Sequence, residues 1–419
     1  MESGSAEVMN TVDWKTGTWE RKKGASPAAE IMIAGDWAPI RDFSDPILED
    51  PEAVYGDLLP VLRESHLRMV NLESPLADGG TPMVKSGAVL KGRPEHMAGL
   101  TAVPFELVTL GNNHVFDYGV EAFVKTRDLL VEKGIRFTGA GLSLAEARAP
   151  AVVTVNGVRI GVLSFGEGED LTAATPDLPG VLGWEIEWIV EEVKRLRSEV
   201  HVVIVVCHGG VEYIPFPPPY LVEALCRIAD AGADLIIGHH PHVPQGILIR
   251  RAVPICFSLG NFVFFQPTEL IYRKTGYLLK AGVSKGGLTG IQMIPYAIGS
   301  RRLMRLGKTD QEKTLRILEA ISDPLSRPEG VADAWHAFLK HYGISGFKNE
   351  MAAILDELET APPKGAAMFR NRLTALQHSR HLMALMTRIM EGTLDDAPTW
   401  AEAWVTDFFS RKVADGLPG

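Results

Sequence analysis

The sequence predicts an α/β fold in which a largely parallel β-sheet is covered by helices on both faces. The first observation is that short apolar strands alternate with helical patterns from about residue 31 to about residue 240. This alternation is typical of βαβ units. The second observation is a run of later strands without helices between them, near 246–250, 253–258, 276–283 and 287–295. This run indicates a second sheet or an antiparallel extension. From about Thr309 onward the pattern is helical.

The first three predicted strands each stop at a polar side chain. The strand over 31–35 ends at Asp36, and the strand over 67–72 ends at Glu73. The strand over 105–110 ends at Gly111-Asn112-Asn113-His114. Between the strands we expect helices and one Gly/Pro/Ser-rich loop, with helices over 51–65, near 95–103 and over 119–133, and the loop over 74–94.

The later strands follow the same rule. Asn156-Gly157 is a strong hairpin signal between strands over 151–156 and 158–165. A helix over 184–199 places its apolar residues on one face. The remaining elements are a strand over 202–207 that stops at His208, a helix over 220–231 and a strand over 234–237 that stops at Gly238-His239-His240.

Composition restricts the class of protein. The chain has 419 residues and a formal net charge of −10, which argues against nucleic acid as a partner because phosphate backbones attract a basic surface. Three cysteines give no disulfide framework and indicate a reducing compartment. No apolar run approaches the roughly 18 residues of a membrane span, and no signal peptide is recognised. We therefore expect a cytoplasmic protein without a membrane partner, and a homo-oligomer is possible.

Polar residues of the kinds that bind metals gather at the strand ends. Ligands bind outside the carboxyl ends of strands in open α/β sheets, so these side chains are expected to meet at one edge of the sheet. Taken singly, Asp36 could be a helix cap, Glu73 a solvated residue, Asn113 a turn residue and His208 a hydrogen-bonded histidine. Three histidines within residues 239–242 are harder to explain that way. The set is Asp36, Glu73, Asn113, His114, His208, His239, His240 and His242.

The chemistry of this set indicates a divalent cation. Carboxylates, an amide oxygen and imidazoles form a mixed oxygen and nitrogen shell, and no cysteine belongs to it. Such a shell suits Ca, Mn, Mg or Zn, as one ion or two. No fingerprint of an organic cofactor is visible, so we expect none.

Six sequence blocks resemble the CapA family, which is similar to the calcineurin-like metallophosphoesterases. The blocks are G-D-W at 35–37, N-L-E-S-P-L at 71–76, G-N-N-H-V-F-D-Y-G at 111–119, C-H-G-G-V-E-Y at 207–213, G-H-H-P-H-V-P-Q-G at 238–246 and F-S-L-G-N-F-V-F at 257–264. The resemblance implies a sandwich of two mixed β-sheets flanked by helices, with a C-terminal helical subdomain. The expected domains are an extension over 1–29, a catalytic domain over 30–308 and a helical region over 309–419.

The resemblance also implies roles for individual residues. His114 matches the position of a general acid or base, and Asp117 can orient its imidazole. Asp36 and His242 are further catalytic candidates. Asp36-Trp37-Ala38 lacks the histidine of the D-x-H motif common in phosphoesterases, so one metal position should have fewer nitrogen ligands. The implied metal ligands are Asp36, Glu73, Asn113, His208, His240 and His242, and weaker candidates for substrate binding are Lys85, Arg93, Glu212, His239 and Asn261.

Three functions are compatible with this site. The first is a metal-dependent peptide epimerase that inverts a Cα centre, as in the soluble lasso-peptide subgroup that the family resemblance suggests. The second is CapA-type poly-γ-glutamate synthesis or hydrolysis, or a phosphoesterase. The third is a non-catalytic metal-binding component of a polymer-synthesis complex. His114 and Asp117 favour an enzyme, because a structural metal needs no acid/base pair.

Overall fold

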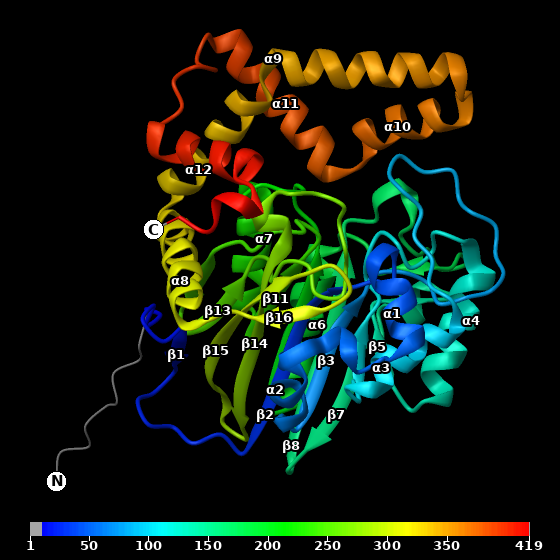
Figure 1. Ribbon diagram of the computed structural model, residues 1–419, viewed down its shortest axis with the longest axis vertical. Coiled ribbons are helices and arrows are strands. Elements are labelled where there is room, and N and C mark those ends of the chain that lie inside the picture. The colour runs from blue at the N-terminus through cyan, green and yellow to red at the C-terminus, as the bar shows by residue number, and fades with distance from the viewer. Residues whose placement is uncertain (1–10, 419) are drawn as a thin grey trace.

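The computed structural model describes residues 11–418 and shows two β-sheets packed against each other and flanked by helices (Figure 1). The larger sheet has the strand order β1-β15-β14-β2-β3-β4-β5, and β16 pairs with β15. Strands β2 to β5 are parallel, and the others pair antiparallel. Its strands are β1 (Thr18–Glu20), β2 (Ala29–Trp37), β3 (Leu67–Leu72), β4 (Leu107–Thr109), β5 (Arg136–Thr138), β14 (Thr275–Ser284), β15 (Gly287–Ile298) and β16 (Leu303–Arg305).

The second sheet has the strand order β12-β13-β11-β10-β8-β7. Its four inner strands are parallel, and the edge strands β7 and β12 are antiparallel to their neighbours. Its strands are β7 (Ala151–Val155), β8 (Val158–Gly166), β10 (Val202–His208), β11 (Leu235–His239), β12 (Ile247–Arg250) and β13 (Val253–Cys256), and a separate pair is formed by β6 (Ala140–Gly141) and β9 (Gly180–Val181).

Alternating side chains of the larger sheet fill two different cores. In β2, Ile31 and Ile33 join the core shared with the second sheet, whereas Met32 packs on the opposite face. In β3, Met69 and Val70 divide in the same way. This alternation follows from the two-residue period of a strand, and it keeps both faces of the parallel strands buried.

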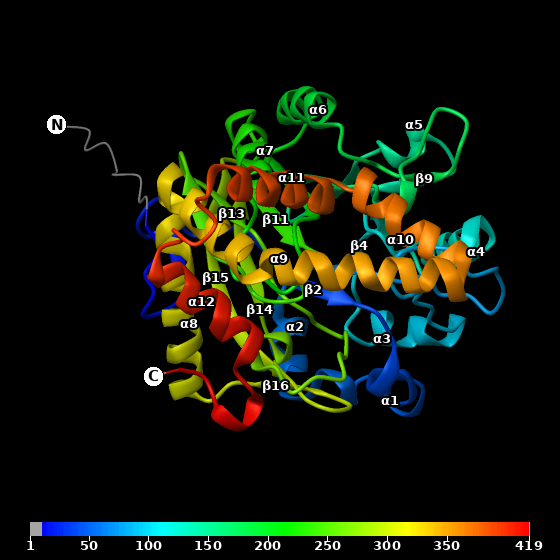
Figure 2. The same ribbon diagram turned by 90° about the horizontal axis from the view of Figure 1, so that it is seen from above.

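Helices cover the outer faces and one end of the sandwich. Helices α9, α10 and α11 lie across the end at which the parallel strands finish (Figures 1 and 2). The α-helices are α1 (Ser44–Glu49), α2 (Leu59–Glu64), α3 (Met97–Ala102), α4 (Gly119–Glu132), α5 (Leu144–Ala147), α6 (Ile186–Glu199), α7 (Pro219–Asp230), α8 (Lys308–Ser322), α9 (Pro328–Thr360), α10 (Pro362–Thr374), α11 (Leu376–Glu391) and α12 (Thr399–Ser410).

The predicted sandwich of two mixed sheets with a C-terminal helical region is confirmed. The expectation of one helix over 51–65 is wrong, because the chain forms the 3₁₀ segment Ala53–Leu58, interrupted at Gly56 by a φ of 52°, and then the short helix α2. Part of the expected extension over 1–29 forms β1 in the larger sheet, and its residues 1–10 lie outside the described residues. Among residues 11–418, no helix is both long and apolar enough to cross a membrane.

Candidate metal centre and acid/base pair

The ends of parallel strands in both sheets bring the candidate ligands together. Asp36 lies in β2 and Glu73 directly follows β3, both in the larger sheet. His208 ends β10 and His239 ends β11, both in the second sheet. The expectation that all these residues share the edge of one sheet is therefore wrong. The site lies where the carboxyl ends of two packed sheets meet.

Glycines allow the two sheets to approach at this point. A Cβ atom on Gly111, which precedes the Asn112-Asn113-His114 loop, would lie 2.8 Å from the Ser164 Oγ of the second sheet. A Cβ on Gly166 would lie 2.8 Å from the carbonyl oxygen of Gly111. Larger residues at these positions would force the two strand ends apart.

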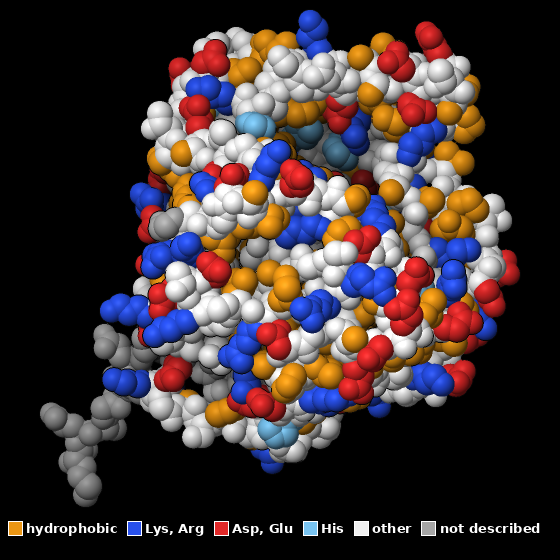
Figure 3. Space-filling model, viewed as in Figure 1, with side chains coloured by type: hydrophobic (Ala, Val, Ile, Leu, Met, Phe, Trp, Pro, Cys, Tyr) orange, Lys and Arg blue, Asp and Glu red, His pale blue; other side chains and the backbone are white. Residues whose placement is uncertain are grey.

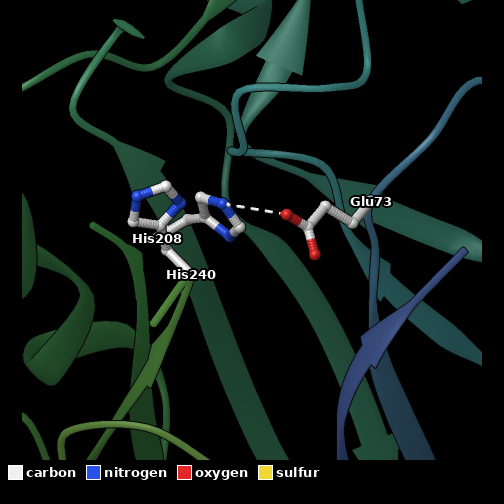
Figure 4. A group of neighbouring side chains, drawn as sticks. All are labelled: Glu73, His208 and His240. Atoms are coloured by element: carbon white, nitrogen blue, oxygen red, sulfur yellow. Dashed lines mark ion pairs between the residues drawn. The ribbon is translucent and has the colours of Figure 1, made fainter. Parts of the chain in front are cut away.

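Glu73 is the centre of the cluster. One group of possible ligands consists of Glu73, His208 and His240, which Figure 4 shows converging from the two sheets. A second group consists of Asp36, Glu73 and His242. Within each group the ligand atoms lie within 4.8 Å of one another. The arrangement therefore offers two cation positions that share the Glu73 carboxylate.

Asn113 completes the first of these groups. Nε2 of His208 lies 3.0 Å from Oδ1 of Asn113 and 3.4 Å from Oε1 of Glu73. One nitrogen and two oxygens thus point at the same small volume. An amide oxygen, a carboxylate and imidazoles are a donor set suited to a divalent cation.

The buried atoms of the cluster lack enough protein partners. Both Glu73 oxygens, Oδ2 of Asp36 and Nδ1 of His240 are buried without a hydrogen-bond partner among the described residues. Burial, and next the charge of Asp36, raises the pKa of Glu73 well above its usual value. An unsatisfied buried carboxylate is costly, and a cation would compensate it. The residues present therefore fit a divalent metal.

His239 and His242 lie against the Asp36 carboxylate. Its Oδ1 lies 3.0 Å from Nδ1 of His239, and its Oδ2 lies 3.4 Å from Nδ1 of His242. Burial alone would raise the pKa of Asp36, but the nearby His239, and next His242, lower it well below its usual range. Asn261 fixes His242 through its Oδ1, 2.8 Å from Nδ1, and donates to the His242 carbonyl.

His114 and Asp117 form the expected pair beside this cluster. Nδ1 of His114 lies 2.6 Å from Oδ2 of Asp117. Lys85 donates to the other oxygen of Asp117 at 2.9 Å, and all three side chains are buried. Burial, and next the charge of Lys85, lowers the pKa of His114, although Asp117 acts in the opposite direction. Lys85, expected to bind substrate, thus has its charge matched by Asp117.

A cavity of about 370 Å³ opens beside the cluster and exposes part of it. His114, Asn113 and His242 line it together with Glu212. Histidine side chains are visible in the hollow beneath the C-terminal helices in Figure 3. Arg93, expected near the substrate, does not line this cavity and is exposed.

The backbone of the site is strained at three positions. Tyr213, His240 and His242 have φ values of 67°, 99° and 56°, in the region that side-chain-bearing residues rarely adopt. Such conformations persist only where the surroundings enforce them, and they concentrate at functional sites. Here they turn the chain sharply after β10 and β11 so that His240 and His242 both face Glu73.

Sequence reasoning missed the contribution of the C-terminal helices to the site. Gln377 of α11 places its Oε1 3.1 Å from Nε2 of His240, and its backbone N–H donates to Glu167. Asn371 of α10 donates to Glu169, which also accepts from Asn113. No motif marks these residues, because they reach the site only through tertiary packing of the helices over the strand ends.

The comparisons with known proteins identify the family. The family model for bacterial capsule synthesis protein PGA_cap matches residues 30–266. The chain belongs to this family. The PGA_cap match includes every predicted ligand but excludes α10 and α11. The predicted CapA resemblance is thereby confirmed, whereas the lasso-peptide subgroup stays a prediction.

Curated relatives of this chain have names that refer to polymer synthesis. The chain is 31% identical over 221 residues to the PGA biosynthesis protein CapA of Bacillus subtilis, covering 51% of this chain and 57% of that protein. It is 28% identical over 295 residues to a probable polyglutamine synthesis accessory protein of Mycobacterium tuberculosis, covering 64% and 76%. Among solved structures, the Haemophilus influenzae NAD nucleotidase is similar at 17% identity and a TM-score of 0.40, covering 70% of this chain and 56% of that one.

Gln377 is expected to tune metal affinity from outside the PGA_cap match. Its amide oxygen accepts from Nε2 of His240, which leaves Nδ1 free to bind a cation. Removing such a supporting partner costs about 10- to 100-fold in metal affinity. We expect Gln377→Ala to weaken Mn²⁺ binding by that factor in isothermal titration calorimetry. Met383→Ala is the matched control, since Met383 lies on the same helix and is 69% exposed; equal affinities in the two variants would disprove the role of Gln377.

Proposed function

We propose that this chain is a metal-dependent enzyme that performs acid/base chemistry on a peptide. The observation that carries the proposal is the buried His114–Asp117 pair, whose His114 lines the same cavity as Asn113 and His242 of the ligand cluster. Because Nδ1 of His114 is bound to Asp117, Nε2 is the nitrogen available for proton exchange with a substrate. A metal with a purely structural role would not require this second, separately held imidazole.

The family supports a peptide as the substrate class. Curated relatives are named for PGA biosynthesis and for polyglutamine synthesis. The chain matches 57% of the length of the Bacillus subtilis relative. We therefore propose a glutamate-rich peptide as the substrate of this chain, with the cavity beside Glu73 as its binding site.

The first candidate reaction is epimerisation at a Cα atom. Inversion needs one group that removes the Cα proton and another that returns a proton to the opposite face. His114 follows a strand of the larger sheet and His242 follows a strand of the second sheet, and both line the cavity. Each imidazole has a carboxylate partner, Asp117 or Asp36. A divalent ion bound to the cluster would stabilise negative charge on the substrate carbonyl.

The second candidate reaction is amide hydrolysis, and the sharing of Glu73 between two ligand groups favours it. If Asp36, Glu73 and His242 hold a second ion, His242 is a ligand and does not exchange a proton with the substrate. Water then adds to the amide carbonyl carbon, the C–N bond breaks, and His114 remains as the acid that protonates the leaving nitrogen. One bound ion therefore favours epimerisation, and two bound ions favour hydrolysis.

One isotope experiment distinguishes these reactions. The protein is incubated with Mn²⁺ and α- or γ-linked glutamate oligomers in deuterium oxide enriched in ¹⁸O, and the products are analysed by mass spectrometry. Epimerisation replaces one Cα hydrogen with deuterium, without cleavage. Hydrolysis produces shorter peptides with ¹⁸O in the new carboxylate. If no oligomer exchanges deuterium or is cleaved, the proposal of an enzyme acting on glutamate peptides fails.

A further inference from the structure

The cavity beside the metal-ligand cluster contains an arginine without an acceptor. Arg273 lies in the 3₁₀ helix Ile271–Lys274, immediately before β14, and it lines the cavity. Its guanidinium lies 3.5 Å from the centre of the Tyr213 ring. Its Nε is buried without a hydrogen-bond partner, and no carboxylate among residues 11–418 forms an ion pair with it. A half-buried cation in this state still needs an anion.

The other cations at the cavity have partners. Lys85 forms an ion pair with Asp117 at 2.9 Å. Arg41 donates through Nη1 to the carbonyl oxygen of Phe265 at 2.8 Å, which fixes it at the cavity wall and leaves its other N–H groups free. The neighbouring Lys274 donates to a backbone carbonyl and lines a different pocket. Among the described cations that line this cavity, Arg41 and Arg273 therefore form no ion pair with a carboxylate, and Arg273 also has a buried N–H group without a hydrogen-bond partner.

The acidic residues of the cavity are directed elsewhere. Glu169 accepts hydrogen bonds from Asn113 and Asn371 at the metal cluster. Glu212 lies 4.0 Å from Nε2 of His242. Glu212 is near enough for its charge to act on Arg273, but neither carboxylate forms an ion pair with Arg273 among residues 11–418.

We propose that Arg273, assisted by Arg41, binds the anionic oxygens of a substrate carboxylate or phosphate in this cavity. The inference rests on the proposed function and deepens it, because it assigns an anionic group to the substrate next to the reacting centre. A guanidinium presents N–H donors in a planar fork that matches carboxylate and phosphate oxygens. Tyr213 fixes the plane of this fork, and Gln266 donates to the Tyr213 hydroxyl at 3.4 Å. Little side-chain freedom is then lost when the anion binds.

Binding of small anionic probes tests the inference. Triglutamate, triglutamine and inorganic phosphate are titrated into the Mg²⁺-loaded protein by calorimetry. The wild type should bind triglutamate and should bind triglutamine more weakly. Arg273→Gln should weaken triglutamate binding by about 10- to 100-fold, the effect of losing hydrogen bonds between charged groups. Arg273→Lys should weaken it by a smaller factor. Arg302→Gln, a change at an exposed arginine away from the cavity, should behave as the wild type.

The outcomes separate the anion source and the two proposals. A phosphate affinity that depends on Arg273, without such dependence for triglutamate, would assign the site to phosphate oxygens. Equal binding of both probes by wild type, Arg273→Gln and Arg273→Lys overturns the inference. If Arg273→Gln does not fold, Arg41→Gln and Arg273→Lys decide in the same way. If the wild type exchanges isotopes but the Arg273 variants bind the probes as tightly as it does, the inference fails and the proposed function stands. If binding depends on Arg273 but no isotope exchange is found, only the proposed function is contradicted.

Discussion

Replacing His114 by asparagine is expected to reduce turnover by about 10²- to 10⁴-fold, the usual contribution of a general acid or base. The physical reason is its position: His114 lines the cavity and is oriented by Asp117, but it belongs to neither ligand group. Metal affinity should therefore remain close to that of the wild type. Steady-state kinetics on the peptide found by isotope exchange, together with metal titration, measures both quantities.

Asp117→Asn provides the companion to this variant. It retains a polar group at 2.6 Å from His114 but removes the negative charge that both His114 and Lys85 face. We expect turnover to fall while the metal affinity is unchanged.

Full activity in His114→Asn would exclude His114 as the acid or base. Loss of metal in the same variant would instead make it a ligand.

Replacing Glu73 by glutamine is expected to abolish high-affinity metal binding at both positions, because Glu73 is common to the two ligand groups. In the metal-free protein the same change should not lower the melting temperature. Both Glu73 oxygens are buried without hydrogen-bond partners among the described residues, and a neutral amide is less costly to bury there. Calorimetric unfolding with and without Mn²⁺ measures this. At a hundredfold excess over the dissociation constant, the ion should stabilise the wild type by about 2.7 kcal/mol and the variant not at all.

Glu212→Gln is the matched control for this experiment. Glu212 lines the cavity beside the cluster but is in neither ligand group, and it is more exposed than Glu73. Its metal-dependent stabilisation should equal that of the wild type. A Glu73→Gln protein that still gains stability from Mn²⁺ would show that the ion binds elsewhere.

The strands and their polar ends could be predicted from local pattern. The strand over 67–72 is observed as Leu67–Leu72, and the hairpin at Asn156-Gly157 joins β7 and β8 as expected. These strands end where a run of apolar side chains stops, and the local sequence alone shows where that is. The same stops predicted Glu73 and His208 as neighbours, and their 3.4 Å separation agrees.

Two features could not be predicted in this way: the division of the strands into two sheets, and the contacts of the C-terminal helices with the site. The hydrophobicity pattern shows where a strand ends but not which sheet it joins, so the sequence predicts His208 on the same edge as Glu73, whereas the two residues follow strands of different sheets. Gln377 and Asn371 lie in a helical segment whose amphipathic pattern specifies only a buried face. Their contacts with His240 and Glu169 depend on how that face docks. Likewise, the sequence around Lys85 does not predict its ion pair with Asp117, 32 residues away.

The most direct measurement is anomalous X-ray diffraction from crystals grown with Mn²⁺. Anomalous difference peaks are expected beside the Glu73 carboxylate. One should lie toward His208 and His240 and, if a second ion binds, one toward Asp36 and His242. The same data count the ions and so favour one of the two reactions. An absence of any peak within bonding distance of Glu73, at metal concentrations that saturate binding in solution, would contradict the proposed metal centre.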